Sequence, residues 1–300
     1  MIRLAVLIVL SANYALAQKI TTIQIPGSDH SFEMVTIPSG KISGVELPEF
    51  WMGTHEVTWD EFALFQEKQL DTEVSTHPTQ AYELDAISRP TPQYIDFSYG
   101  MGKEGGFPAV SMTRRAALAY CQWLYKKTGV FYRLPTEAEW QYVCSEGSGQ
   151  TLPPSYAEVP PSEYAWFDGS SNEKYHPTGS KKPNQWGVYD LMGNVSEWTM
   201  DGYSEDYYAE LKLKGEQGIL WPVKKHPTSV MGSNYQSSIT DCSCQTKIAS
   251  TAQWQKRDPQ IPKSKWWNTD APFVGFRLVS PMIQPDAQTV ATFFEKALKN

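Results

Sequence analysis

The pattern of apolar and polar residues predicts short strands and helices. Residues 32–38 and 273–279 are rich in β-branched and aromatic residues, which is typical of strands, and a proline closes the first. Apolar residues at three-to-four spacing predict a helix that begins after Thr113 and ends at Gly129, and a C-terminal helix over residues 286–298. Strands and helices are interspersed, so the pattern favours a mixed α+β fold.

Two capping boxes mark further helix starts. Thr58 with Glu61, and Thr136 with Glu139, have the Thr-x-x-Glu spacing. In this motif each side chain accepts a hydrogen bond from an amide of the first turn that the helix itself leaves unpaired. We therefore expect helices to begin at these two threonines.

Residues 71–108 contain many Pro, Gly and Tyr residues without a clear period, which predicts a long ordered loop or several short strands. The chain shows no internal repeat and no linker-like change of composition. We expect a single loop-rich domain over residues 18–300 with a short C-terminal helix.

The first residues have the three-part pattern of a secretory signal. Arg3 supplies a positive charge, residues 4–10 are apolar, and Ala15-Leu16-Ala17 fits the cleavage site. The apolar run is shorter than the about 20 residues that a membrane-spanning helix needs. We therefore expect residues 1–17 to be a cleaved signal peptide and the product to be secreted or periplasmic, without a transmembrane segment.

The composition is that of a folded, acidic protein. The net charge is −7 over 300 residues, and no basic run interrupts the chain, so nucleic acid is not expected as a partner. The 11 Trp, 16 Tyr and 12 Phe residues, together with 20 Gly and 21 Pro, favour aromatic anchors among many loops over a bundle of long helices.

Four cysteines, Cys121, Cys144, Cys242 and Cys244, allow three pairings in an oxidising compartment. Cys242 and Cys244 are too close in sequence to bridge each other easily. One of them paired with Cys144 or Cys121 is the simplest expectation. A Cys-x-Cys pair is also a ligand set for a soft metal such as Cu(I), which leaves a second interpretation open.

Several segments, in this order, resemble the formylglycine-generating enzyme family, also called sulfatase-modifying factors. The matching segments are Met52-Gly53, Glu56-Val57-Thr58, Pro108-Ala109-Val110, residues 119–124, Tyr132 to Tyr142, Gly187 to Trp198, and Gly275-Phe276-Arg277. The block Arg-Leu-Pro-Thr-Glu-Ala-Glu-Trp at residues 133–140 is close to diagnostic. The resemblance covers residues 32–280 and implies a C-type-lectin-like core with long loops. Fold alone does not settle function.

The resemblance implies a structural calcium site between residues 190 and 197. Carried over by position, Asp190 and Glu197 supply side-chain carboxylates, and Gly193 and Val195 supply backbone carbonyls. Hard oxygen ligands of this kind suit Ca²⁺. The resemblance thus predicts calcium as a cofactor.

At the catalytic positions the sequence departs from the family. The active enzymes hold Cu(I) with two thiolates in a Cys-x4-Cys arrangement and oxidise a substrate cysteine with O₂. Here the first position falls on Ser237 and the second on Cys242, after an altered motif that begins at Met231. One thiolate and a hydroxyl make a poor site for soft copper, so copper is not the expected cofactor. The family pattern also implies a displaced disulfide between Cys144 and Cys244.

Three functions remain open. The leading hypothesis is a calcium-stabilised binding or maturation factor with a protein or peptide partner. The second is an active metal-dependent oxidoreductase acting on a peptide Cys or a secondary metabolite, with Cys242 at its centre. The third is a carbohydrate-binding module that uses Trp266, Trp267 and the aromatic residues of 94–99, although these are more simply interpreted as core. The five histidines lack metal-ligand spacing, which disfavours an iron enzyme.

Overall fold

A computed structural model describes residues 19–71 and 88–299 of the chain. The predicted signal peptide, residues 1–17, lies outside the described residues, as does part of the predicted loop over 71–108. Within the described ranges, none of the helices combines the length and apolar character that crossing a membrane requires.

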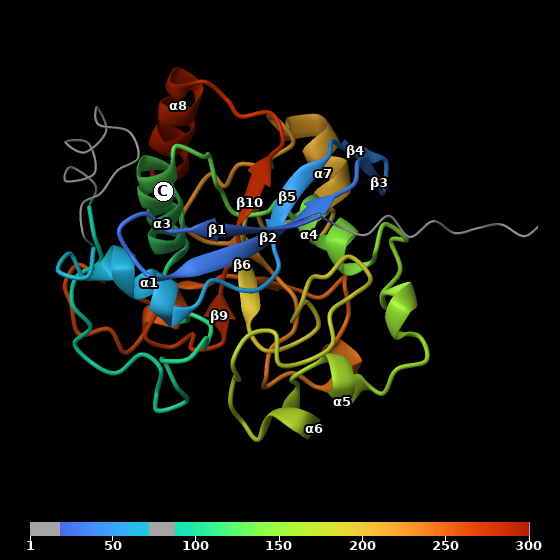
Figure 1. The fold of residues 1–300 in the computed structure, drawn as a ribbon, viewed down its shortest axis with the longest axis horizontal. Helices are drawn as coiled ribbons and strands as arrows, with labels where there is room; N and C mark the ends of the chain where they lie inside the picture. Colours follow the sequence, from blue (N-terminus) through green and yellow to red (C-terminus); the bar gives the residue numbers. More distant parts are fainter. Residues whose placement is uncertain (1–18, 72–87, 300) are drawn as a thin grey trace, which may run out of the picture.

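The first sheet is antiparallel and lies across the middle of the molecule (Figure 1). Its strand order is β1 (Ile20–Gln24), β2 (Ser31–Ile37), β5 (Phe50–Gly53) and β10 (Val279–Pro281). Strand β2 is the strand predicted over 32–38. Thus the N-terminal and C-terminal parts of the described chain are joined in one sheet.

The second sheet is mixed, and it contains the end of the predicted calcium loop and the start of the altered motif at Met231. Its order is β8 (Lys247–Ala249), β7 (Thr228–Met231), β6 (Ser196–Gly202) and β9 (Val274–Gly275), with β6 and β9 parallel. A separate hairpin pairs β3 (Gly40–Ile42) with β4 (Val45–Leu47).

The predicted single strand over 273–279 is wrong. The chain forms β9, leaves the second sheet, and only then enters β10 in the first sheet. Arg277 lies between the two short strands and explains the break. Its buried guanidinium binds the carboxylate of Glu197, so the chain does not continue the strand pairing of β9 through this residue. This crossing ties the two sheets together.

Three of the helices begin where the capping residues predict. Thr58 and Thr136 form complete capping boxes with Glu61 and Glu139, and Thr113 caps the long helix. That helix ends at Gly129, which has the left-handed conformation (φ 73°) expected of a C-terminal glycine. The helices are α1 (Trp59–Gln66), α3 (Arg114–Thr128), α4 (Glu137–Cys144), α5 (Pro161–Tyr164), α6 (Asp168–Ser171), α7 (Tyr207–Lys214) and α8 (Ala287–Ala297), with 3-10 turns η1 (Pro154–Tyr156), η2 (Ile239–Asp241) and η3 (Ala252–Gln255).

Aromatic side chains form much of the core. Helix α3 packs between α1 and α8 (Figure 1), and its Tyr120 and Trp123 lie against rings from α1. Trp267 is fully buried and stacks on Phe97 with ring centroids 4.9 Å apart. The interpretation as core is confirmed for Trp266, Trp267 and Phe97, whereas Tyr94 is half-buried and Tyr99 is exposed.

Candidate functional site

The segment that follows β7 corresponds to the predicted catalytic motif. Gly232 has φ +81°, and a Cβ there would lie 2.9 Å from the ring of Trp140. The Ser233 hydroxyl donates a hydrogen bond to the Met192 carbonyl at 2.9 Å. The side-chain amide of Asn234 donates to the Ser196 hydroxyl at 3.0 Å. The segment is thereby fixed against the loop over residues 190–197, so the predicted copper and calcium regions are neighbours.

Ser237, at the first predicted thiolate position, closes a turn. Its hydroxyl accepts a hydrogen bond from the backbone amide of Asn234 at 2.9 Å, and its own backbone amide donates to the backbone carbonyl of Asn234 at 2.9 Å. Its carbonyl accepts from the amide of Asp168 at 3.0 Å. These contacts give Ser237 a structural role that its hydroxyl is well suited to fill.

Cys242, at the second position, is a free and half-buried thiol just after η2. Burial raises the pKa of this thiol, the Ser233 hydroxyl opposes the rise, and the nearby carboxylates of Asp241 and Asp168 add to it. A raised pKa keeps the group protonated at neutral pH, whereas the thiolate is the form that binds metals and attacks substrates.

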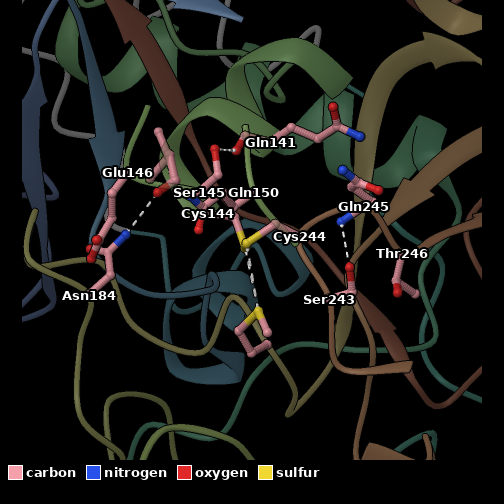
Figure 2. The surroundings of a disulfide bond; sticks show 12 residues. Gln141, Cys144, Ser145, Glu146, Gln150, Asn184, Ser243, Cys244, Gln245 and Thr246 are labelled. Carbon is pink, nitrogen blue, oxygen red and sulfur yellow. Dashed lines mark hydrogen bonds between the residues drawn. A yellow bond between two sulfur atoms is a disulfide. The ribbon is translucent and has the colours of Figure 1, made fainter. Parts of the chain in front are cut away.

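Cys244 forms a disulfide with Cys144, the last residue of α4, with 5.4 Å between the Cα atoms (Figure 2). This confirms the displaced pairing that the family pattern implied. Met192 packs its thioether 3.6 Å from one sulfur and 3.7 Å from the other. Because Cys244 is bridged, it cannot serve as a second thiolate beside Cys242. Cys121 is free but fully buried in α3.

Glu197, a predicted calcium ligand, is held by an arginine instead. Its Oε1 accepts from Arg277 Nη2 at 2.6 Å, and its Oε2 accepts from Arg277 Nε at 2.6 Å and from Trp140 Nε1 at 2.9 Å. Both side chains of the ion pair are buried. The charge of Glu197 is therefore already compensated by Arg277, and its role as a calcium ligand stays a prediction.

Asp190 keeps an open oxygen. The residue is buried with φ 60°, and its Oδ2 accepts from the Gly179 amide at 2.6 Å. Its Oδ1 and the Oε2 atom of Glu56 are both buried without a hydrogen-bond donor in the described residues. The other Glu56 oxygen, Oε1, accepts a hydrogen bond from the side-chain amide of Asn194 at 3.0 Å. Two such carboxyl oxygens require a shared proton or a cation.

The charges of this cluster perturb one another. Burial raises the pKa of Glu56 well above its usual range, Asp190 and Glu197 act in the same direction, and Arg277 opposes them. Burial likewise raises the pKa of Asp190 to about 6, against the Gly179 amide and Arg277. Among the described residues no group of three or more His, Cys, Asp or Glu side chains is arranged to hold a metal. Calcium at this loop accordingly stays a prediction that depends on backbone carbonyls such as those of Gly193 and Val195.

Sequence reasoning missed the roles of Glu56 and Arg277. Both lie in the matched motifs, but nothing was assigned to them. The available signal was a charge within an apolar run, since Arg277 stands between Phe276 and Leu278. A charged residue in such a run is almost always paired when buried.

The profile of the sulfatase-modifying factor enzyme 1-like domain family matches residues 16–282. The chain belongs to this family, and the resemblance found in its motifs is confirmed. Serine/threonine-protein kinase Pkn1 of Chlamydia trachomatis is 30% identical over 175 residues, which are 58% of this chain and 26% of that protein. The protein named inactive C-alpha-formylglycine-generating enzyme 2 of Bos taurus is 31% identical over 132 residues, 41% of each chain. The chain therefore spans about a quarter of the kinase and two fifths of the bovine protein.

The solved structure of PvdO from Pseudomonas aeruginosa has the same fold. The two structures superpose with a TM-score of 0.60 at 22% identity, over 87% of this chain and 98% of that one. At this identity the likeness establishes the fold alone. Activity must be argued from the residues at the site.

Proposed function

We propose that this protein is an extracytoplasmic binding or maturation factor of the sulfatase-modifying factor family that has lost the copper thiol pair. The observation that carries the proposal is the disposition of the cysteines around the family's copper position. Cys244 is bridged to Cys144, the first position is Ser237, and Cys242 is the one free thiol in the described part of this segment. Cu(I) favours two soft ligands, and a single protonated thiol does not provide them.

Two further observations support parts of this proposal. The signal pattern at residues 1–17 and the Cys144–Cys244 disulfide are both typical of an oxidising, extracytoplasmic compartment. A relative at 31% identity is named as an inactive formylglycine-generating enzyme, which supports a role for this fold without that activity. A scaffold freed from catalysis keeps its loops as a recognition surface, for which a protein or peptide is the proposed partner.

Calcium binding remains part of the proposal, with a changed ligand set. Asp190 Oδ1 and Glu56 Oε2 are the buried oxygens that lack a donor, and the carbonyls of Gly193 and Val195 are the backbone groups that the family pattern adds. We leave Glu197 out of the proposed set because its charge is already paired with Arg277, which donates to both of its oxygens. Calcium would supply further positive charge to this carboxyl pair, in addition to that of Arg277.

The second candidate is an O₂-dependent oxidoreductase acting on a peptide Cys or a secondary metabolite. Its support is that Cys242 stays free and half-buried at the second family position. A carbohydrate-binding role has less support, because Trp266, Trp267 and Phe97 are packed in the core, and Tyr99 is the exposed ring of this set.

The test is an anaerobic Cu(I) titration of residues 18–300 with the disulfide intact, against a competing chelator. The proposal predicts no tight one-to-one binding and no difference between the wild type and Cys242→Ser. Tight binding that is lost in Cys242→Ser would overturn it in favour of the oxidoreductase. O₂ consumption with Cys-containing peptides would then be measured.

A further inference from the structure

A pocket of about 240 Å³ lies at the start of α3, and its lining residues come from outside the segment over residues 231–244 that carries Cys242 and Cys244. The lining is basic although the protein is acidic overall, with a net charge of −7. No Asp or Glu contributes to it. The basic lining residues are Arg114, Arg115, Lys224, Lys225, His226, Lys265 and Lys299, and the others are Thr113, Trp198, Thr228 and Asn268.

Among the described residues, the six lysines and arginines of this pocket form no ion pair with a carboxylate. Eleven other Lys and Arg residues in the described ranges form ion pairs, but these six do not. Asp201 and Asp258 act on Arg114 and Lys225 from outside the lining. Like charges gathered without counter-ions repel one another, so the fold gains no stability from the arrangement. A bound anion would relieve that repulsion.

Two arginines supply the more buried basic groups of the lining. Arg114 is only 7% exposed, and it donates Nε to the Thr199 carbonyl at 2.9 Å and Nη2 to the Met200 carbonyl at 2.6 Å. These bonds fix its guanidinium in place. Burial lowers its pKa to about 10, which still leaves it charged at neutral pH. The Nε atom of Arg115 is buried and has no partner in the described residues.

His226 adds a neutral donor. Its Nδ1 lies 2.8 Å from the Ser250 hydroxyl, and its Nε2 is buried without a partner among the described residues. Burial, with Lys225 acting in the same direction, lowers the pKa of His226 to about 4, so the ring is neutral. When Ser250 donates to Nδ1, the remaining ring proton is on Nε2 and is free to donate.

We propose that this pocket binds the phosphate or sulfate ester group of a small hydroxylated molecule. Guanidinium groups match the geometry of tetrahedral oxyanions, and the exposed lysines at the rim provide further point charges. Asn268 is 1% exposed and its Oδ1 is unpartnered in the described residues, so it offers an acceptor for a hydroxyl of the same ligand. The volume is below the roughly 300 Å³ at which drug-sized sites begin, which favours one ester group on a small carrier.

Calorimetry at low ionic strength tests this. The probes are inorganic phosphate, inorganic sulfate, glucose 6-phosphate, glucose 6-sulfate and glucose. We expect saturable one-to-one binding of at least one ester, weaker binding of the matching free ion, and none of glucose. A preference between the two esters identifies which oxyanion the site takes. Raised salt is expected to weaken binding.

Variants distinguish the pocket from general charge. The pair Lys224→Gln and Lys265→Gln removes two exposed rim charges and is expected to weaken ester binding by about tenfold or more. The matched control, Lys174→Gln with Lys212→Gln, removes two exposed charges elsewhere and is expected to leave binding unchanged. Arg115→Lys keeps the charge but loses the planar fork, and is also expected to weaken binding.

Two results would overturn the proposal. One is the absence of saturable binding by any of the anions at low salt. The other is equal weakening by the rim pair and the control pair, which would mean non-specific attraction. All of these lysines are exposed, so the variants are expected to fold, and circular dichroism verifies this.

Discussion

Arg277 and Glu197 form a bidentate ion pair, with two hydrogen bonds of 2.6 Å, in the buried region where the two sheets meet. Removing one member of a buried pair leaves an uncompensated charge, which costs about 3–5 kcal/mol. We therefore expect Arg277→Met to lower the free energy of unfolding by about this amount, measured by urea denaturation. The cost is increased by Glu56 and Asp190, which also depend on this cation.

The control for that variant is an exposed ion pair. Arg257 bonds Asp270 at 2.5 Å, but its side chain is 66% exposed. Arg257→Met is expected to change the free energy of unfolding by at most about 1 kcal/mol. Equal losses in the two variants would contradict the assignment of Arg277 as the central cation.

The Cys144–Cys244 disulfide spans 100 residues of sequence. Cross-linking a loop of that size restricts the unfolded chain and is worth up to about 4.7 kcal/mol in the chain-entropy account. The double variant Cys144→Ala and Cys244→Ala should be less stable than the wild type by about 2–5 kcal/mol in urea. Reductant should destabilise the wild type and leave the double variant unaffected. Insensitivity of the wild type to reductant would argue against the bridge.

Glu61 gives the folding stability a pH dependence. Burial raises its pKa from 4.5 to about 7, against hydrogen bonds from the Thr58 amide and hydroxyl. The folded state thus binds this proton more tightly than the unfolded state, so the contribution is present below pH 4.5 and is lost as pH rises through about 7. In Glu61→Gln one oxygen still accepts both Thr58 bonds without a charge.

The free energy of unfolding of Glu61→Gln, measured relative to that of the wild type, should rise by up to about 3 kcal/mol when the pH is raised from 4.5 to 8. Urea denaturation at the two pH values measures the difference. Parallel pH profiles for the two proteins would show that Glu61 ionises in the folded state as it does in the unfolded one.

Calcium should raise the unfolding temperature relative to EDTA, because a ligand that binds only the folded state stabilises it by mass action. Asp190→Asn keeps an oxygen that accepts the hydrogen bond of 2.6 Å from the Gly179 amide, but it loses the negative charge. This variant should therefore lose most of the calcium-dependent rise in unfolding temperature. Glu197→Gln should retain the shift, measured from its own lower baseline. Identical unfolding temperatures in calcium and EDTA would remove calcium from the account.

Local signals in the sequence predicted the starts of α1, α3, α4 and α8 and the end of α3, whereas α5, α6 and α7 were not predicted. The capping threonines and Gly129 act within one turn, so their positions can be identified without knowledge of the rest of the fold. The pairing of strands that are far apart in the sequence was harder to predict. The segment over 273–279 has a strand-like composition, but the partners of β9 and β10 lie in different sheets, and composition carries no information on this.

The candidate site was predictable only in part. The family pattern indicated the Cys144–Cys244 pairing and the loss at Ser237, since both depend on position along the chain. It did not indicate that Arg277 would occupy both oxygens of Glu197, because these residues are 80 positions apart. The basic pocket was also missed, since its lysines and arginines come from segments that the fold alone brings together.

The central claim is that one substitution, serine for cysteine at position 237, leaves the copper position incomplete. The most direct measurement is a side-by-side Cu(I) titration of the wild type, Ser237→Cys and Ser238→Cys, each with the Cys144–Cys244 disulfide intact and the added thiol verified as free. The account predicts tight one-to-one binding by Ser237→Cys, which restores the Cys-x4-Cys spacing to Cys242, and weak binding by the other two. Wild-type binding as tight as that of Ser237→Cys would contradict it.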